Sequence, residues 1–370
     1  MPRRRPSSQH AVNLKSLARQ LGVSAMTVSN AFNRPEELSS SLRQRILSAA
    51  AQLGYHGPHP SGRMLRTGKT GSIGLFNPDP IPHLFEDLNA AAFLTGISEV
   101  CAKHQCGLTV LPPIREASQM TAIDKVAVDG FILYAIPDHS PMIKRLLGRQ
   151  VPTVTVDMTR LPDIPAIGID DRGAARKIAR HVLMMGHRRI AVLSLEMMPD
   201  GFSGKVALDR IKKCRGSVTH QRLMGYGDAL TDAGLDPGAI ELYEIRNNDD
   251  EEARYWATEF LSRKAARPTA ILAMSDRMAF GAVRAAARLG LQIPRDLSVV
   301  GFDDIESPDG MVRLTTIRQP SKSKGQLAAS LVAGDLPYVA EHRILPTEMI
   351  VRDSVAPPPK EGKIRKMKSK

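Results

Sequence analysis

The sequence predicts an N-terminal three-helix domain of the helix-turn-helix type, followed by an α/β region of two doubly wound subdomains. Residues 13–54 carry apolar side chains at helical spacing and almost no strand signal. Beyond residue 71, short apolar runs alternate with amphipathic stretches, as expected for parallel sheets covered by helices. At 370 residues the chain is also too long for a single compact core.

The N-terminal domain is expected to contain three short helices. Gly22 separates the first helix from the second, for which Ser24 is a candidate N-cap. Ser39 or Ser40 fits the same role for the third helix. The apolar positions that define these helices are Leu14, Leu17, Ala18, Leu21, Val28, Phe32, Leu42, Ile46, Ala49 and Leu53. Residues 54–71 are rich in Gly, Pro, His and basic residues and are expected to form a linker.

The α/β region contains several apolar runs of strand length. They cover residues 73–76, 108–111, 131–134, 153–156, 190–193, 270–273 and 297–302. A region of this length accommodates two parallel sheets. Because such sheets bind ligands at the carboxyl ends of their strands, we expect a ligand cleft between the two subdomains.

Positive charge is concentrated at the two ends of the chain. Residues 1–70 hold 11 Lys or Arg but only two acidic residues, Glu36 and Glu37, whereas residues 71–356 are close to neutral. A basic module of this kind indicates contact with a phosphate backbone. The alternative is a solvated tail at each end, which we prefer for residues 360–370.

The sequence lacks the usual signals of a membrane protein, a secreted protein and a metal-binding protein. No run of about 18 apolar residues exists, and the basic N-terminus does not lead into a signal-peptide core. We therefore expect a cytoplasmic protein with no membrane partner. Cys101, Cys106 and Cys214 are odd in number and lack metal-ligand spacing, so we expect no disulfide, no metal site and no cofactor.

The second helix is expected to read DNA. Val23 and Val28 fill its interface with the first helix, which leaves a polar face outside. The candidate DNA-binding residues on that helix are Ser24, Ala25, Met26, Thr27, Ser29, Asn30 and Asn33. In a major groove, hydroxyls hold phosphates, Asn pairs with adenine and small apolar groups meet thymine methyls. A module that binds a protein is the alternative, but the basic charge favours DNA.

Residues 23–33, followed by Gly54, Tyr55 and residues 64–70, resemble the lactose-repressor (LacI/GalR) family of transcription regulators. In that family the linker forms a hinge helix on the operator and a leucine wedges into the minor groove. Leu65 matches this leucine, and Tyr55 is carried over as a further DNA contact. The resemblance implies a repressor, although an activator would use the same modules.

The resemblance also implies the domain boundaries and the assembly. The expected parts are a DNA-binding domain (1–58), a hinge (59–70), an effector-binding and dimerisation domain (71–356) and a basic, disordered tail (357–370). One helix-turn-helix contacts too few bases for specificity. We therefore expect a homodimer on a near-palindromic operator of double-stranded DNA.

The sequence departs from this family in the part that reads DNA. Asn30 stands where most relatives carry Arg, which would replace a guanine or phosphate contact by an adenine contact or remove it. Gly62 stands where the hinge usually has Ala, at a cost of up to about 1 kcal/mol in helix formation. The stretch 55–65 is one residue longer than usual. These departures predict a weakly ordered hinge.

The resemblance continues to about residue 356 and implies a periplasmic-binding-protein-like pair of α/β subdomains around an effector. The positions that match ligand contacts of the family are Phe85, Asp157, Arg222, Ser275 and Asp303. An interdomain ion pair is the alternative for Arg222 and Asp303, and a core position is the alternative for Phe85. Asp170 and Asp276 are expected to cap helices.

The effector is expected to be a small polar metabolite or a sugar derivative. Gly168 and Asn248 stand where relatives carry stacking aromatics. The segment 195–220 is longer than the family norm. A transport protein is disfavoured by residues 1–70. An enzyme is disfavoured because no metal-spaced His pair, phosphate-binding glycine loop or nucleophile elbow occurs, so we expect no catalytic residue.

Overall fold

A computed structural model describes residues 13–57, 60–113, 121–136, 140–214, 216–264, 266–307, 310 and 312–360. The chain divides into two compact units between Thr70 and Gly71. In the described ranges, every strand lies in the second unit.

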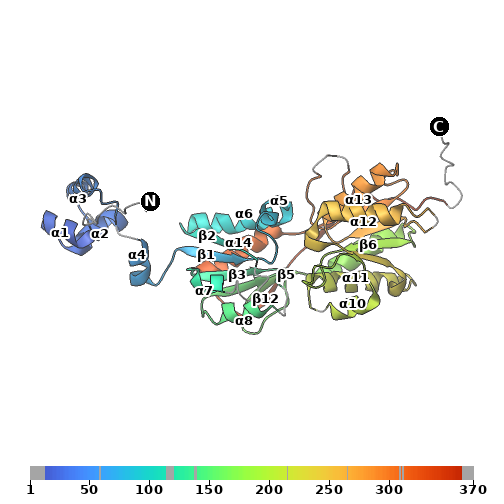
Figure 1. The fold of residues 1–370 in the computed structure, drawn as a ribbon, viewed down its shortest axis with the longest axis horizontal. Helices are drawn as coiled ribbons and strands as arrows, with labels where there is room; N and C mark the ends of the chain where they lie inside the picture. Colours follow the sequence, from blue (N-terminus) through green and yellow to red (C-terminus); the bar gives the residue numbers. More distant parts are fainter. Residues whose placement is uncertain are drawn as a thin grey trace, which may run out of the picture. The chain divides into compact units, whose positions relative to one another are not determined.

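The first unit has the predicted helix-turn-helix fold. Its helices are α1 (Leu14–Leu21), α2 (Ala25–Asn33), α3 (Ser40–Gln52) and α4 (Pro60–Thr67), with the 3-10 turn η1 (Pro35–Glu37) after α2 (Figure 1). The side chains of Asn13, Ser24 and Ser39 cap the first three helices. Helix α1 ends at Gly22, whose φ of 67° lies in the left-handed region. The predicted break at Gly22 and the predicted caps at Ser24 and Ser39 are confirmed.

A small apolar core holds the first three helices together. Leu17, Val28 and Ile46 come from one helix each, and all three are fully buried. Ala18 is buried beside them, since a small side chain allows α1 and α2 to approach closely. This core fixes the orientation of α2 within the module.

The second unit begins with a six-stranded parallel sheet in the order β12-β5-β4-β3-β1-β2. Its strands are β1 (Ser72–Phe76), β2 (Gly107–Leu111), β3 (Gly130–Tyr134), β4 (Thr153–Val156), β5 (Ala166–Ile169) and β12 (His342–Leu345). The helices around it are α5 (His83–Glu86), α6 (Leu88–Lys103), α7 (Thr121–Lys125), α8 (Pro141–Leu147) and α14 (Ser321–Ala333).

Helices cover both faces of this sheet, as Figure 1 shows. Side chains alternate along β1, so Ile73 and Leu75 pack towards α6 and α14, whereas Phe76 packs in the opposite layer with α7 and α8. Helices α6 and α14 cross closely at Gly96, where a Cβ would lie 2.0 Å from the carbonyl oxygen of Lys322. The crossing therefore requires glycine.

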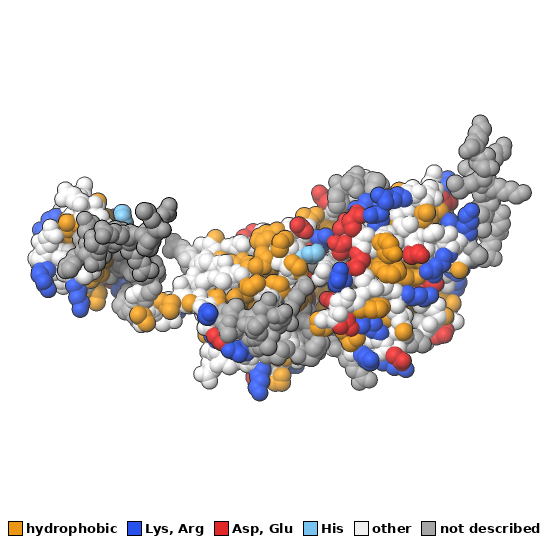
Figure 2. All heavy atoms as spheres, viewed as in Figure 1, with side chains coloured by type: hydrophobic (Ala, Val, Ile, Leu, Met, Phe, Trp, Pro, Cys, Tyr) orange, Lys and Arg blue, Asp and Glu red, His pale blue; other side chains and the backbone are white. Residues whose placement is uncertain are grey.

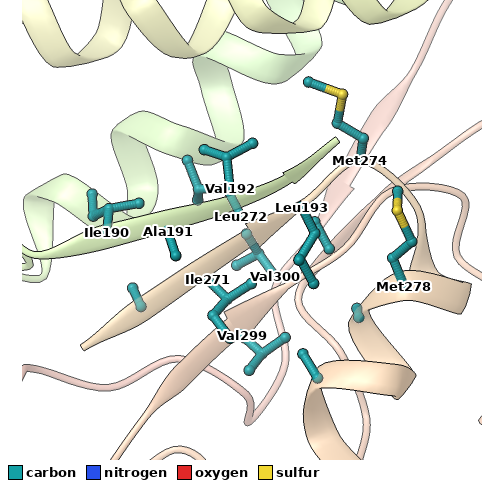
Figure 3. Packing of buried hydrophobic residues seen from close by; sticks show 14 of the residues in the cluster. Ile190, Ala191, Val192, Leu193, Ile271, Leu272, Met274, Met278, Val299 and Val300 are labelled. Carbon is teal, nitrogen blue, oxygen red and sulfur yellow. The ribbon is translucent and has the colours of Figure 1, made fainter. Parts of the chain in front are cut away.

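A second sheet of five strands follows in the order β10-β9-β6-β8-β7. Its strands are β6 (Ile190–Ser194), β7 (Gly204–Lys205), β8 (Glu241–Glu244), β9 (Ala270–Ala273) and β10 (Ser298–Val300), of which β7 alone is antiparallel to its neighbour. Its helices are α9 (Asp171–Met184), α10 (Leu208–Lys213), α11 (Val218–Asp232), α12 (Asp250–Leu261) and α13 (Asp276–Arg288), with 3-10 turns η3 (Pro237–Ala239) and η4 (Arg246–Asn248). Buried aliphatic side chains of β6, β9 and β10 pack with Met278 of α13 (Figure 3).

Two short strands form a third, two-stranded sheet. β11 (Thr316–Arg318) pairs with β13 (Glu348–Ile350) in an antiparallel ribbon. Leu345, at the end of β12, packs against the cores of both subdomains. The carboxyl ends of the parallel strands consequently face the region between the sheets, as predicted.

The C-terminal segment is partly ordered by contacts with the second subdomain. The structure describes the chain to Lys360, beyond the point at which we expected disorder to begin. The Ala356 carbonyl oxygen lies 2.8 Å from Nε2 of the buried His187. Pro358 is half-buried beside Gly186. The remainder of the predicted tail, residues 361–370, lies outside the described residues.

The described ranges contain neither a helix that could span a membrane nor a cluster of side chains that could hold a metal ion. None of their helices has the length and apolar character that a bilayer span requires. No group of His, Cys, Asp and Glu residues in these ranges is arranged to hold a metal ion.

Candidate functional site

The outward face of α2 carries the residues predicted to read DNA. Val28 and Ala31 point into the core, while Met26 is 61% exposed. The Ser24 hydroxyl accepts a hydrogen bond from the Thr27 backbone N–H (2.9 Å) and lies 2.8 Å from the Thr27 hydroxyl. The hydroxyls at the start of α2 thus cap the helix and remain at its solvent side. Ala25, Ser29, Asn30 and Asn33 are half-buried or exposed on the same helix.

The two asparagines of this face have different partners. The Asn33 Nδ2 donates to the Ser29 carbonyl oxygen one turn earlier (3.0 Å). The Asn30 Nδ2 instead donates to Oε2 of Glu37, outside the helix (2.6 Å). Glu37 also accepts a hydrogen bond from Arg34 (2.7 Å). The orientation of the Asn30 amide is therefore set by a carboxylate that the sequence did not single out.

Two arginines of α3 support the module rather than extending from it. Arg45 donates to the Leu21 carbonyl oxygen at the end of α1 (2.8 Å). Arg43 donates to the Ala31 carbonyl oxygen in α2 (3.3 Å). Lys15 and Arg19 are exposed on α1. Lys and Arg side chains lie on the visible surface of this unit (Figure 2).

Tyr55 packs into the core of the first unit. It is 9% exposed and packs edge-on against the ring of Phe32, with 5.7 Å between ring centroids. Burial raises the pKa of its phenol. Its ring is thus part of the module's core and not of the exposed face of α2. The DNA contact that the resemblance implies for Tyr55 stays a prediction.

Leu65 lies on α4 and is 84% exposed. An apolar side chain of this size gains nothing for folding at that exposure. The minor-groove wedge stays a prediction for this residue.

Arg222 is the central cation of the second unit. It extends from α11 and is almost fully buried. Its Nε donates to Oδ1 of Asp171 (2.8 Å), its Nη1 donates to the Met274 carbonyl oxygen (2.5 Å), and its guanidinium stacks on the Phe302 ring. Burial alone would lower the pKa of Arg222, but the carboxylates of Asp171 and Asp303 more than offset this and the pKa is raised. The hydrogen-bonded ion pair of Arg222 is with Asp171, whereas sequence reasoning considered Asp303.

Asp303 follows β10 and faces the region between the subdomains. Its backbone φ of 130° is unusual for a residue with a side chain, and its backbone N–H donates to the Ile317 carbonyl oxygen (2.7 Å). Its Oδ1 accepts a hydrogen bond from Nε2 of Gln319 (2.5 Å). Burial raises the pKa of Asp303 well above its ordinary value, although nearby Arg222 acts in the opposite direction.

Asp157 has a partner that the sequence analysis missed. Lys324 of α14 is only 1% exposed, and its Nζ lies 2.5 Å from Oδ2 of Asp157 and 2.8 Å from Oε1 of Gln319. The other carboxylate oxygen of Asp157 is buried and has no hydrogen-bond partner in the described part of the chain. Asp157, Lys324, Gln319 and Asp303 therefore form a polar chain from one subdomain to the other.

A second polar connection runs parallel to the first. Ser275 caps α13 and donates to Oδ1 of Asn248 (2.5 Å), whose Nδ2 donates to Oδ2 of Asp87 (3.0 Å). Asp87 in turn caps α6 of the first subdomain. Ser275 is thus the cap that we had assigned to Asp276, whereas Asp170 caps α9 as predicted. Asn248 lies in the cleft, as its alignment implied, but it forms hydrogen bonds.

Phe85 does not line the groove between the subdomains. It lies on the short helix α5 and is 62% exposed, which corrects the core alternative. Its ligand contact stays a prediction. The aromatic ring at the carboxyl end of β3 is Tyr134, stacked on Phe93 with 4.4 Å between centroids. Burial, followed by the carboxylate of Asp157, raises the pKa of Tyr134 well above its ordinary value. The position of Tyr134 at the end of a predicted strand was the sequence signal that could have identified it as a cleft residue.

A groove of about 340 Å³ opens beside the first polar chain. Its walls include Asn89 and Ser321 from the first subdomain, Asp303 and Ile305 from the second, and Gln319 between them. The groove therefore gives a small molecule contact with both subdomains.

The long segment 195–220 is fastened to the edge of the second sheet. Arg210 donates from Nε to Oε2 of the fully buried Glu244 (2.5 Å) and from Nη1 to Asp200 (2.7 Å). Its guanidinium also lies 4.3 Å from the ring centre of Phe202. Arg210 lowers the pKa of Asp200 to about 2. This segment is thus an ordered extension of the sheet.

Comparisons with known proteins agree with both units. Residues 13–58 match the family model described as bacterial regulatory proteins, lacI family, and residues 179–355 match a periplasmic binding protein-like domain. An HTH-type transcriptional regulator of Mycobacterium tuberculosis is 35% identical over 362 residues, which cover 95% of this chain and 99% of that protein.

Two solved structures show the same fold over nearly the whole chain. A LacI-family transcriptional regulator from Corynebacterium glutamicum superposes with a TM-score of 0.69 at 29% identity, covering 95% of this chain and 99% of the other. The lac repressor dimer bound to operator and the anti-inducer ONPF gives a TM-score of 0.73 at 24% identity, covering 93% and 99%.

Proposed function

Because this chain belongs to the lacI family of DNA-binding transcriptional regulators, we propose that it is a repressor whose operator affinity is controlled by a small polar metabolite or sugar derivative. The effector binds between the two α/β subdomains. The observation that carries this proposal is the pair of polar connections across the cleft, from Asp157 to Asp303 and from Asp87 to Ser275. The relatives that the chain matches are regulators rather than enzymes.

The DNA-binding half of the proposal concerns the assembly on the operator. The face of α2 combines hydroxyls, amides and the exposed Met26, which are groups suited to a major groove. A single α2 reaches only a few base pairs. The lac repressor, whose fold this chain shares, is seen as a dimer on its operator. We therefore assign to this chain a homodimer that reads a near-palindromic site.

The charges in the cleft restrict the chemistry of the effector. Each buried cation is already paired with a carboxylate, Arg222 with Asp171 and Lys324 with Asp157. Asp303 and Asp87 add carboxyl groups without adding a cation. Among the described residues, a phosphate or carboxylate ligand would therefore find no buried Lys or Arg that is not already paired with a carboxylate. A neutral molecule with several hydroxyls, or one with an amine, suits the unpartnered oxygen of Asp157.

The same contacts suggest how the effector would act. An effector shifts a conformational equilibrium only if it binds the two arrangements of the subdomains with different affinity. A ligand hydroxyl that replaces Asn248 of the second subdomain as the partner of Asp87 in the first would make that affinity depend on the spacing of the subdomains. Weaker operator binding in the presence of the effector would then follow.

The test begins with the DNA sites. Fragments of genomic DNA bound by the purified full-length chain would be sequenced, and the best site used in titrations. A panel of neutral sugars, polyols, amino sugars and sugar phosphates would then be screened by thermal shift, since a bound ligand raises the midpoint of unfolding. We expect a neutral or amine-bearing compound to raise the midpoint and weaken operator binding. Tighter binding of a phosphorylated compound than of its neutral counterpart would contradict the charge argument.

A further inference from the structure

Glu37 is an unusual residue for a surface that binds DNA. It is one of only two acidic residues among residues 13–57, and its carboxylate would repel the phosphates of a nearby backbone. Its side chain is 39% exposed, so the residue is not needed to fill the core. A negative charge at this place therefore needs another explanation.

The hydrogen bonds of Glu37 supply one. Its Oε2 accepts from Nδ2 of Asn30 and its Oε1 accepts from Arg34. An ionised carboxylate can only accept hydrogen bonds, so the NH₂ group of Asn30, and not its oxygen, must face Glu37. Rotation of the amide by 180° would place Oδ1 of Asn30 against a like partial charge. Glu37 thus selects one of the two orientations of the amide.

We propose that Glu37 is a positioning residue that fixes the amide of Asn30 to read adenine, an inference that rests on the proposed function. The Nδ2 of Asn30 has two hydrogens, and Glu37 takes one of them. The second hydrogen and Oδ1 remain for a base. Adenine offers an acceptor at N7 and a donor at N6 on its major-groove edge, which matches this pair.

Arg34 makes the carboxylate tolerable at a DNA surface. Its Nη1 lies 2.7 Å from Oε1 of Glu37, and this hydrogen bond raises the pKa of Arg34. The two charges cancel beside Asn30. Because the ion pair is largely exposed, its contribution to folding is small. Substitution of Glu37 should therefore change base preference more than stability.

Asn33 provides the contrast within the same helix. Its Nδ2 is held by the Ser29 carbonyl oxygen, one turn away. The helix itself sets the orientation of that amide. Asn30 is the amide on this face whose orientation depends on a side chain from outside α2.

The test is selection of duplexes from a library with randomised half-sites, using the full-length chain. The variants are Asn30→Ala, Glu37→Gln, Glu37→Ala and, as matched control, Arg34→Ala. Asn30→Ala identifies the base position that Asn30 contacts, which we expect to be adenine in the wild type. A bidentate contact discriminates by about 5-fold to about 150-fold.

We expect both Glu37 variants to lose most of the adenine preference at that position and to keep the preferences elsewhere. Gln at position 37 can donate to Oδ1 of Asn30, which lets the amide turn over. Arg34→Ala should weaken binding to all duplexes, because a positive charge is lost, while the adenine preference remains. Equal unfolding midpoints would show that the variants are folded.

Three results would overturn the inference. They are a preference other than adenine at the Asn30 position, an unchanged adenine preference in Glu37→Ala, and an equal loss of preference at every position in the Glu37 variants. Failure of the proposed function would look different, since the wild type would then select no sequence at all.

Discussion

The Nζ of Lys324 lies 2.5 Å from Oδ2 of Asp157, and the two residues are 167 positions apart in the chain. Lys324 belongs to α14, which follows the crossing from the second subdomain, and Asp157 follows β4 in the first. Because Lys324 also contacts Gln319, which donates to Asp303, the ion pair anchors one end of a connection between the subdomains. The cleft is thus spanned by the protein's own polar groups.

Replacement of Lys324 by Met should destabilise the second unit strongly. Met fills a similar volume, but Asp157 would be left as a buried carboxylate without its cation. Removing one member of a buried ion pair typically costs about 3–5 kcal/mol. Urea unfolding of the full-length chain would measure the loss in the free energy of unfolding. The double variant Lys324→Met with Asp157→Asn should recover part of it, and a single variant as stable as the wild type would show that the pair contributes little.

Asp276 should make the stability of the second unit depend on pH. The residue is fully buried at the start of α13, where it accepts hydrogen bonds from the Thr316 hydroxyl (2.7 Å) and the Ile305 N–H (2.9 Å). Burial raises its pKa to about 7. The folded chain therefore holds a proton that the unfolded chain releases near pH 4. The stabilising effect is complete below the unfolded pKa and is lost as the pH rises through 7.

The comparison for Asp276 is the Asn variant. We expect the free energy of unfolding of the wild type to fall more steeply between pH 4 and pH 8 than that of Asp276→Asn, by on the order of 4 kcal/mol. The Thr316 hydroxyl can accept from the new amide, which keeps the variant folded. Asp171 also has a raised pKa, but it is present in both proteins and cancels in the difference. Asp276 contributes to the raised pKa of Asp303, so the difference between the two curves includes the change at Asp303. If the free energies of unfolding of the two proteins changed with pH in the same way, the proton would be bound by a group other than Asp276.

Local features of the DNA-binding module could be predicted because neighbours in sequence determine them. The spacing of Leu17 and Leu21, the break at Gly22 and the cap at Ser24 depend on residues within one or two turns. The parallel sheets could also be predicted, because short apolar runs alternate with amphipathic stretches along the chain. Tyr55 differs because a short turn after α3 decides whether its ring faces the core, and no periodic pattern covers that turn.

The cleft was harder to predict because its contacts join distant parts of the chain. The effector contact of Arg222 stays a prediction, and its ion-pair partner Asp171 lies on another helix, 51 residues away. Lys324 is the clearest omission. It shares the buried face of α14 with Ser321, Ala328 and Val332, so a lysine at that spacing was a visible signal for a buried cation. The core alternative for Phe85 was wrong because its position in the sequence does not give a side-chain direction.

Leu65→Ala should weaken specific binding far more than non-specific binding. A wedge acts only where the DNA can be opened at a deformable step, and unstacking that step involves a few kcal/mol. We expect a loss of roughly tenfold or more on the operator and little change on a random duplex at the same salt concentration. Since Leu65 is exposed, the unfolding midpoint should stay the same. Met64→Ala on the same helix is the matched control, and equal losses on both duplexes would refute the wedge.

Asp303→Asn should abolish the response to the effector while leaving effector-free operator affinity within a few fold. Asn is close in shape to the protonated carboxyl group, and its oxygen still accepts from Gln319, so the fold is retained. The change nevertheless removes the ionisable carboxyl group that a ligand hydroxyl or amine would contact. Because coupling between the sites depends on the effector's different affinity for the two subdomain arrangements, loss of this contact removes the coupling without altering α2.

Asp170→Asn, which preserves a helix cap outside the groove lining, is the control. Operator titrations with and without effector, together with calorimetry of effector binding, would measure both properties. Normal effector affinity in Asp303→Asn would show that Asp303 serves only the polar connection between the subdomains.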